Sequence, residues 1–494
     1  MAVLAFQADP WTSGTPTASE YGDPATFRLG PNAELFGAMA WTTAAERGFD
    51  WTDLTFFTKY LGLLALSAAI ADGFTADLRV YGDAASTVAF TGHDFAYLWP
   101  WDGASTAGLV GGTVTGFSGT IQGRGAFTIT GLSVPAETLV ALVHREDAQA
   151  IIDANDLLLA GDDLIIGSDR NDALRGGAGD DTLVGRGGDD RLDGGAGHDT
   201  AEMGAIGFRG AHVAASGGAW TVASAAGTDT LSNIEAVAFA DGRLVLDADG
   251  AAAQVVRLYA AALDRAPDGA GLAFWVGAAE HGHSLSGLAA AMLESGECRA
   301  RFGHGADDGG FVDRLYRTVL GRDGDAEGHA FWSDALHHGA TRGDILVAFA
   351  ESAENRTATA ATIRDGIWVQ SEAAQEVARL YDTVLGRLPD APGLVAWKEA
   401  IESGHATLAA VADAFAASAE FQDRYGALGH REFADALYRN TLHRAPDQAG
   451  LDHWSAALEA GAGRAAVVLA FSESAEHVAL TAPEIEGGGG ILFA

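Results

Sequence analysis

The pattern of apolar and polar residues changes along the chain. In residues 1–150, alternating segments such as 76–82 and 125–134 predict β-strands, whereas the apolar spacing of residues 51–70 predicts a helix. We expect this region to be a mainly β domain that carries a helical insertion. Its sequence contains no recognisable nucleophile, metal or phosphate motif.

Residues 151–202 contain five consecutive nine-residue units, which from Leu158 onward read LLAGDDLII, GSDRNDALR, GGAGDDTLV, GRGGDDRLD and GGAGHDTAE. Each unit has aspartate at its sixth place and, apart from Arg170 in the second unit, glycine at its fourth. The eighth places predict a column of inward-facing apolar side chains, namely Ile165, Leu174, Leu183, Leu192 and Ala201. Because this column weakens at Ala201, the stack is expected to end there.

The nonapeptide pattern predicts a parallel β-roll. Six residues of each unit form a glycine-rich turn and three form a short strand, so two units complete one coil. Turn carbonyls and aspartate carboxylates of successive coils then converge into the all-oxygen shell that calcium prefers. A flexible linker rich in glycine and aspartate is the alternative, but an apolar column in phase over five units argues against it.

Alternate units lie on the same side of such a roll, which predicts three calcium sites. The expected sixth-place pairs are Asp163 with Asp181, Asp172 with Asp190, and Asp181 with Asp199. Because Arg170 stands where glycine is expected, the second-unit site is the doubtful one. The predicted calcium ligands are Gly161, Asp163, Asp172, Gly176, Gly179, Asp181, Gly185, Gly188, Asp190, Gly194, Gly197 and Asp199.

Residues 203–250 alternate as short strands, at 219–224 and 243–247. An uncapped roll would expose backbone edge groups that invite strand pairing between molecules. We therefore predict that this segment is a β cap on the open end of the roll.

Beyond residue 250 the spacing of apolar residues is helical, and a sequence pattern repeats four times. In each unit a tryptophan follows a tyrosine by sixteen residues, with an arginine, an aspartate and a glycine at fixed places between them; in the first unit these are Tyr259, Arg265, Asp268, Gly271 and Trp275. Another helix follows and ends in a serine-glutamate signature, at Ser295 in the first unit. We predict four three-helix units, paired as residues 251–366 and 367–481.

The shared residues of these units have a structural interpretation. Asp268 suits a helix start, and Arg265, three residues earlier, is expected to pair with it. The tyrosine and the tryptophan are expected to pack between helices, because fourfold repetition is typical of a core pattern. A ligand-binding aromatic site is the alternative.

Units such as GGAGDDTLV and GGAGHDTAE resemble the haemolysin-type (RTX) calcium-binding repeat. The resemblance implies secretion by a one-step type I exporter, passage as an unfolded chain, and folding on meeting external calcium. The last residues, 482–494, contain a glycine hinge followed by ILF and are similar to the uncleaved carboxyl-terminal signals of type I substrates. A frayed tail is the alternative.

The helical units resemble a domain of unknown function with the signature LGRxPDxxGLxxW, which often follows such repeats in bacterial secreted and surface-layer-like proteins. The signature reads LDRAPDGAGLAFW from Leu263 and LHRAPDQAGLDHW from Leu442, whereas the second unit departs from it at Gly324 and His329. That family carries no established activity, so the resemblance implies a location and no reaction.

The composition limits the classes of molecule that the chain is expected to bind. With 30 Lys and Arg against 67 Asp and Glu, the formal charge of -37 argues against nucleic acid and favours divalent cations. For most of these carboxylates the alternative is that they only keep a secreted protein soluble. The single cysteine, Cys298, excludes an intramolecular disulfide. The most apolar stretch, 61–70, covers about half the length of a membrane helix, so no membrane span is expected. The start lacks the features of a cleavable signal peptide.

We find no zinc helix, nucleophile elbow or phosphate-binding loop in the sequence. The expected fold is multidomain with α and β segregated: a mainly β N-terminal domain, a parallel β-roll with calcium, then all-α tandem helical repeats. The predicted function is that of a secreted, non-enzymatic extracellular protein, adhesive or self-assembling, whose partners are calcium and either itself or a cell-surface component. The alternative is a secreted hydrolase or toxin with its active site in residues 1–150.

Overall fold

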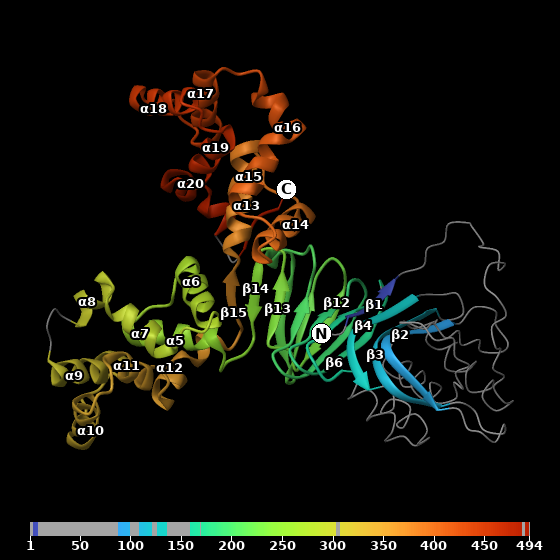
Figure 1. Cartoon of the computed structure of the whole chain (residues 1–494). Coiled ribbons are helices and arrows are strands. Elements are labelled where there is room, and N and C mark those ends of the chain that lie inside the picture. The colour runs from blue at the N-terminus through green and yellow to red at the C-terminus, as the bar shows by residue number, and fades with distance from the viewer. Residues whose placement is uncertain are drawn as a thin grey trace. The chain divides into compact units, whose positions relative to one another are not determined.

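The structure is a computed structural model of the chain (Figure 1). It describes residues 159–167, 169–302, 307–486 and 490–493, together with four earlier strands, β1 (Val3–Gln7), β2 (Thr87–Leu98), β3 (Gly108–Thr120) and β4 (Ala126–Pro135). β3 pairs antiparallel with β2 and with β4, and β4 pairs antiparallel with β1. The strand predicted at 125–134 coincides with β4, whereas the helix predicted at 51–70 lies outside the described residues.

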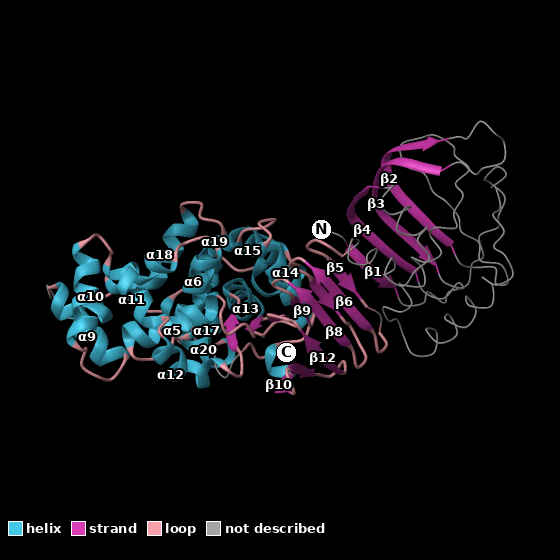
Figure 2. Ribbon diagram, turned by 90° about the horizontal axis from the view of Figure 1, so that it is seen from below, coloured by secondary structure: helices cyan, strands magenta, loops and turns pink. Residues whose placement is uncertain are grey.

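The nonapeptides fold into the predicted parallel β-roll. The odd units supply β5 (Leu164–Ile166), β7 (Thr182–Val184) and β9 (Thr200–Glu202), which pair in parallel, and the even units supply β6 (Ala173–Ala178) and β8 (Arg191–Ala196), which also pair in parallel. Figure 2 shows these strands side by side. The eighth-place side chains of all five units are buried, so they form the core of the roll.

Glycine at the fourth place is required by the close stacking of the turns. Gly179 has a φ of +125°, which side chains larger than hydrogen rarely allow. A Cβ at this position would also collide with the backbone of Gly161 in the preceding odd coil. The repeat therefore encodes glycine for backbone approach as well as for turn geometry.

Three further strands follow the repeats, β10 (His212–Ser216), β11 (Ala219–Ala223) and β12 (Thr228–Ser232). β10 pairs antiparallel with β11, and β11 with β12, but β12 pairs in parallel with β8 (Figure 2). The prediction that the stack ends at Ala201 is therefore wrong. A small residue in the apolar column did not stop the next strand from joining the even-numbered sheet.

The described residues within 1–204 and 211–237 form one compact unit, and those within 205–210 and 238–494 form another. At their junction in sequence lie β13 (Ala236–Phe239) and β14 (Gly242–Val245). In the second unit β14 pairs antiparallel with β15 (Ile367–Gln370), a strand that separates two groups of helices. Apart from this strand, the regular elements of the described residues beyond 250 are helices, as predicted.

Each helical group contains two of the predicted units. The first group comprises α5 (Ala251–Leu263), α6 (Gly269–Glu280), α7 (Leu285–Leu293), α8 (Gly296–Phe302), α9 (Asp308–Val319), α10 (Ala326–His337), α11 (Arg342–Ala350) and α12 (Ala353–Ile363). The second comprises α13 (Glu372–Leu385), α14 (Ala391–Glu402), α15 (Leu408–Ala417), α16 (Ala419–Phe421), α17 (His430–Thr441), α18 (Gln448–Glu459), α19 (Arg464–Ser472) and α20 (Ala475–Ile485). We call them the first and second helical pairs (Figure 1).

A separate hydrophobic core holds each pair together. Val255, Leu315 and Phe349 belong to one buried cluster, and Leu380, Leu437 and Phe471 belong to another. In both clusters the residues come from two successive units. The units therefore share a core within each pair.

Each unit has four helices, so the prediction of three was wrong. The serine of the serine-glutamate signature does not end a helix but caps the next one. Ser352 Oγ, for example, accepts a hydrogen bond from Asn355 N–H at 3.2 Å, and Ser474 Oγ accepts one from His477 N–H at 3.2 Å. A side-chain acceptor at this place satisfies an amide that the first turn leaves without a partner.

Candidate calcium sites of the roll

A column of buried aspartates connects the coils on each side of the roll. The backbone N–H of each sixth-place aspartate donates to Oδ1 of the sixth-place aspartate one coil later; the contacts are Asp163 to Asp181 at 2.8 Å, Asp172 to Asp190 at 2.8 Å and Asp181 to Asp199 at 2.9 Å. All three contacts expected between coils are therefore present. The second of them forms although Arg170 replaces the fourth-place glycine.

The second carboxylate oxygen of these residues defines the candidate sites. Oδ2 of Asp181, of Asp190 and of Asp199 is buried and has no hydrogen-bond partner. Burying a negative charge without a counterion or donor is costly, so a native protein normally supplies a cation or a proton at such a point. The place for such a cation or proton lies between successive coils.

Burial changes the acidity of these carboxyls. Removal from water, together with the charges of Asp163 and Asp199, raises the pKa of Asp181 to about 7, although the backbone hydrogen bond from Asp163 lowers it. Burial likewise raises the pKa of Asp190 to about 7 and raises that of Asp199. Without a cation, Asp181 and Asp190 therefore take up protons near neutral pH.

The first-place glycines bring backbone oxygens to the same points. A Cβ on Gly176 would collide with both Asp181 Oδ2 and the carbonyl oxygen of Gly194, so these two oxygens converge there. On the other side, a Cβ on Gly167 would lie 2.8 Å from Asp172 Oδ2 and 2.9 Å from the carbonyl oxygen of Gly185. At Gly176 and at Gly167, a carboxylate oxygen thus lies close to a carbonyl oxygen from the next coil.

The fourth-place glycines make a different contact. Gly179 packs on the backbone of Gly161, and Gly197 packs on the carbonyl of Gly179. Gly188 packs on the backbone of Arg170 in the same way. The structure therefore brings these glycines onto one another, and the role of their carbonyls as calcium ligands stays a prediction.

The fifth places form a second ladder, which the sequence reasoning missed. Here the direction is reversed, because Asp180 N–H donates to Asp162 Oδ1 at 3.0 Å and His198 N–H donates to Asp180 Oδ1 at 2.8 Å. On the even side Asp189 N–H donates to Asn171 Oδ1 at 2.9 Å. These side chains are exposed and need no metal to satisfy their charge.

The buried columns also continue past the predicted ligands. Asp190 N–H donates to Asp229 Oδ1 at 3.0 Å, and Asp199 N–H donates to Glu235 Oε2 at 2.8 Å. Neither Asp229 nor Glu235 was among the predicted ligands, because both lie outside the five consecutive units.

The donors present fit a calcium ion. Among the described residues, no group of three or more His, Cys, Asp or Glu side chains gathers into a metal cluster, so an ion between coils would need backbone carbonyls beside the carboxylates. Calcium accepts such mixed, all-oxygen surroundings with six to eight ligands, whereas the sites offer no nitrogen or sulfur for softer metals. Calcium would supply the positive charge that the buried Oδ2 atoms lack.

The shared residues of the helical units hold the fold. A Cβ on Gly271 would collide with the hydroxyl of Tyr259, and Asp268 Oδ1 caps α6 by accepting from Gly271 N–H at 2.8 Å. The Arg265 guanidinium lies 5.3 Å from the centroid of the Tyr259 ring. The same close approaches and the same cap recur in the other three units, at Gly328, Gly393 and Gly450.

The shared arginine makes the predicted contact with the aspartate in the first unit, but it has a closer partner. Arg265 Nε donates to Glu297 Oε1 at 2.9 Å, whereas its distance to Asp268 is 3.4 Å. Glu297 belongs to the serine-glutamate signature, which explains why that signature recurs with the arginine. The expected arginine-aspartate pair is therefore the weaker contact, because the aspartate is already engaged as a cap.

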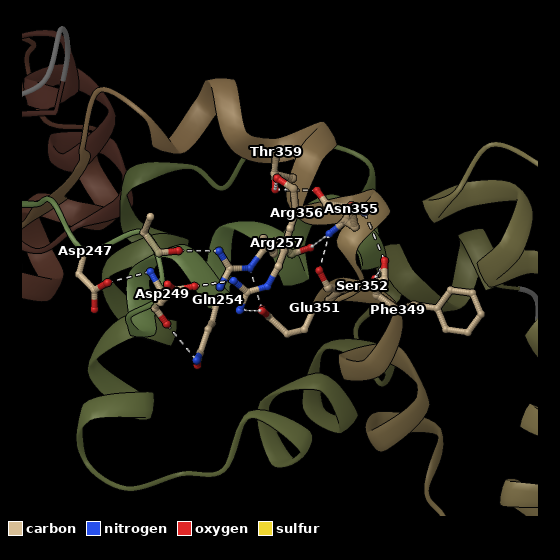
Figure 3. A network of polar contacts seen from close by, with 12 residues as sticks. Asp247, Asp249, Gln254, Arg257, Phe349, Glu351, Ser352, Asn355, Arg356 and Thr359 are labelled. Atoms are coloured by element: carbon tan, nitrogen blue, oxygen red, sulfur yellow. Dashed lines mark hydrogen bonds and ion pairs between the residues drawn. The ribbon is translucent and has the colours of Figure 1, made fainter. Parts of the chain in front are cut away.

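A buried ion pair joins the two units of each helical pair. In the first pair, Arg257 Nε donates to Glu351 Oε1 at 2.8 Å, and its Nη1 donates to the carbonyl of Ala248 at 2.8 Å (Figure 3). In the second pair, Arg379 Nε donates to Glu473 Oε2 at 3.0 Å. Both arginines are buried, so each pair of units is fixed by a desolvated charge contact as well as by its core.

The C-terminal residues 490–493 are docked, which contradicts the frayed-tail alternative for this part of the tail. Ile491 is 0% exposed, and its N–H donates to Asp241 Oδ2 at 2.7 Å. Arg209 Nε donates to the carbonyl of Gly490 at 2.8 Å. Asp241 is itself buried, and burial raises its pKa.

In the part of the chain that the structure describes, no helix combines the length and the apolar character that a membrane crossing requires.

Comparisons with known families agree with this geometry. Residues 166–201 match the model of the RTX calcium-binding nonapeptide repeat (4 copies). Residues 251–302, 289–359, 371–423 and 412–481 match the model of a domain of unknown function (DUF4214). No curated protein matches the chain. Neither family points to catalysis. The chain therefore contains an RTX calcium-binding nonapeptide repeat region, followed by four copies of this domain of unknown function.

Proposed function

We propose that the chain is secreted and that its roll becomes ordered when calcium binds between the coils. The observation that supports this proposal is the set of buried Oδ2 atoms of Asp181, Asp190 and Asp199 that have no hydrogen-bond partner. Calcium would neutralise charge that burial otherwise leaves uncompensated. The proposed ligands are the sixth-place aspartates together with carbonyls of the glycine-rich turns.

Calcium would then act as a folding clamp. Ten aspartates lie between residues 162 and 199, and they repel one another in a metal-free chain. Binding to the folded roll alone shifts the folding equilibrium by mass action. A chain that stays unfolded until it meets external calcium suits one-step export, and the tail would reach an exporter before it docks against Asp241.

The test uses the purified full-length chain freed of metal. Calcium is expected to increase the β signal in circular dichroism and to raise the melting temperature. Magnesium at the same concentration is the control, because it demands octahedral geometry and keeps its water. Asp181→Asn should reduce the gain, since Asp181 contacts the neighbouring coils on both sides. Spectra and melting that calcium leaves unchanged would rule out the clamp.

For the helical pairs we propose an extracellular interaction platform without an active site. The shared residues of the units are occupied by caps, ring contacts and ion pairs, which supports a structural role for them. Phe274 and Phe331 occupy the same place in the first two units and are 64% and 62% exposed. Exposed apolar side chains often mark contact surfaces, and tandem weak contacts add up to avidity.

A further inference from the structure

Residues 224–232 repeat the nonapeptide pattern outside the consecutive run. They read SAAGTDTLS, with Gly227 at the fourth place, Asp229 at the sixth and Leu231 at the eighth. Residues 203–223, which include β10 and β11, separate them from the fifth unit. The spacing alone is a weak match, so the contacts must decide whether this segment is a coil of the roll.

The turn of this segment makes the contacts of a nonapeptide turn. Gly188 N–H donates to the carbonyl of Ala226 at 3.0 Å, as Gly179 N–H donates to the carbonyl of Ala196 at 2.9 Å one coil earlier on the other side. Gly227 has a φ of +152°, close to the +150° of Gly197. A Cβ on Gly227 would collide with the carbonyl of Gly188, which is again the fourth-place contact.

The fifth, sixth and seventh places also reproduce the ladders. Thr228 N–H donates to Asp189 Oδ1 at 2.9 Å, which continues the exposed column. Asp190 N–H donates to Asp229 Oδ1 at 3.0 Å, which continues the buried column. Thr230 N–H donates to the Asp190 carbonyl at 2.8 Å, equivalent to the contact from Arg191 to Asp172.

The strand completes the equivalence. In the parallel pairing of β12 with β8, Leu231 stands opposite Leu192, and both side chains are buried in the apolar column. The fourth to eighth places of residues 224–232 therefore make the contacts that these places make in the roll. β11 pairs with the free side of β12, so the inserted hairpin covers the edge that the sixth unit would otherwise expose.

We infer that residues 224–232 are a sixth nonapeptide, displaced by an inserted hairpin, and that Asp229 with Asp190 forms a further calcium site between the fourth and sixth units. Asp190 is 1% exposed and its Oδ2 has no hydrogen-bond partner, while Asp229 is 5% exposed. Two buried carboxylates in successive coils with hard oxygen donors suit calcium. This inference rests on the proposed function of the first five units.

The experiment counts calcium ions bound to the full-length chain by equilibrium dialysis and calorimetry. Asp229→Asn keeps an acceptor for Asp190 N–H but removes the charge, so we expect it to bind one ion fewer than the unmodified chain. The matched control is Asp189→Asn, which removes one charge from the exposed fifth place of the adjacent coil. The control should bind as many ions as the unmodified chain.

The outcomes separate the two proposals. An unmodified chain that binds no calcium overturns the proposed function itself. An unmodified chain that binds calcium, with an equal count for Asp229→Asn, overturns only the sixth-unit site. The melting temperature of the metal-free proteins is the second readout. Asp229→Asn removes a like charge beside Asp190, so its metal-free melting temperature should equal or exceed that of the unmodified chain. A clear decrease would assign Asp229 a purely structural role.

Discussion

At the scale of single residues, the aspartates of the roll have two opposing effects on the stability of the folded chain. Asp181 and its equivalents fix the register between coils by accepting backbone N–H groups, which favours the folded chain. The same burial leaves Oδ2 of Asp181, of Asp190 and of Asp199 without a hydrogen-bond partner. The metal-free roll can neutralise these buried carboxylates only by binding protons. Protons and calcium are therefore expected to compete for the same oxygens.

This competition predicts how stability depends on pH. The pKa of Asp181 and of Asp190 is about 7 in the folded chain, above the ordinary value of 3.8. Between about pH 4 and 7 the folded form therefore holds protons that the unfolded form has lost, so metal-free stability is highest below this window and falls as pH rises through it. The apparent calcium affinity should rise over the same window.

The measurement is the melting temperature at pH 5 and pH 8, without metal and with saturating calcium. Carboxylates outside the roll also titrate, so Asp181→Asn is the internal control, and it should flatten the metal-free dependence. Asp162, Asp163 and Asp199 are the charges that act on Asp181, and their substitution should flatten it too. A metal-free melting temperature that increases from pH 5 to pH 8 would contradict the assignment.

At the scale of elements, the helical pairs depend on contacts between units. Arg257, in α5, is 2% exposed and reaches Glu351 at the end of α11 (Figure 3). Removing one partner of a buried ion pair leaves an uncompensated charge, whereas exposed pairs contribute little. The buried pair should therefore matter far more to stability than the shared exposed pairs of each unit.

Glu351→Ala tests this expectation. This substitution leaves the buried Arg257 guanidinium without its carboxylate partner. It should lower the free energy of unfolding of the first helical pair by about 3 to 5 kcal/mol. The matched control lies three residues away, since Glu354→Ala removes the exposed ion pair to Arg322 and should have a small effect. Helical circular dichroism during urea unfolding measures both. The double variant Arg257→Met with Glu351→Leu should restore stability; equal losses for the two single variants would refute the argument.

At the scale of the whole molecule, function depends on whether the helical pairs contact other molecules. The second pair has a core of its own, so removing residues 372–494 leaves the core of the first pair complete. In purified protein loaded with calcium, this deletion should weaken attachment to cells or self-assembly measured by light scattering, because it halves the number of tandem units.

Phe274→Ser with Phe331→Ser is the finer variant and should weaken the same attachment without changing the melting temperature, because both side chains are exposed. Leu480→Ser with Leu492→Ser removes two other exposed apolar side chains and serves as the control. If the deletion and the phenylalanine variant both attach as the unmodified chain does, the platform proposal is wrong and residues 1–150 become the region to study.

The sequence by itself determined the elements whose information is local and repeated. Glycine at the fourth place, aspartate at the sixth and an apolar residue at the eighth specify a turn, a charge column and a core within nine residues, so the parallel roll and the contacts between Asp163, Asp181 and Asp199 followed from spacing. The helical character beyond residue 250 followed in the same way from its periodicity.

The tertiary structure decided what depends on partners distant in sequence. A hairpin of 21 residues (203–223) breaks the phase of the repeat, so the place of Asp229 beside Asp190 emerges only when β12 pairs with β8. Glu351 lies 94 residues beyond Arg257, and Ile491 lies 250 residues beyond Asp241. Local patterns state what each segment can form, but burial of a charge or a tail requires a specific neighbour, and only the folded chain supplies it.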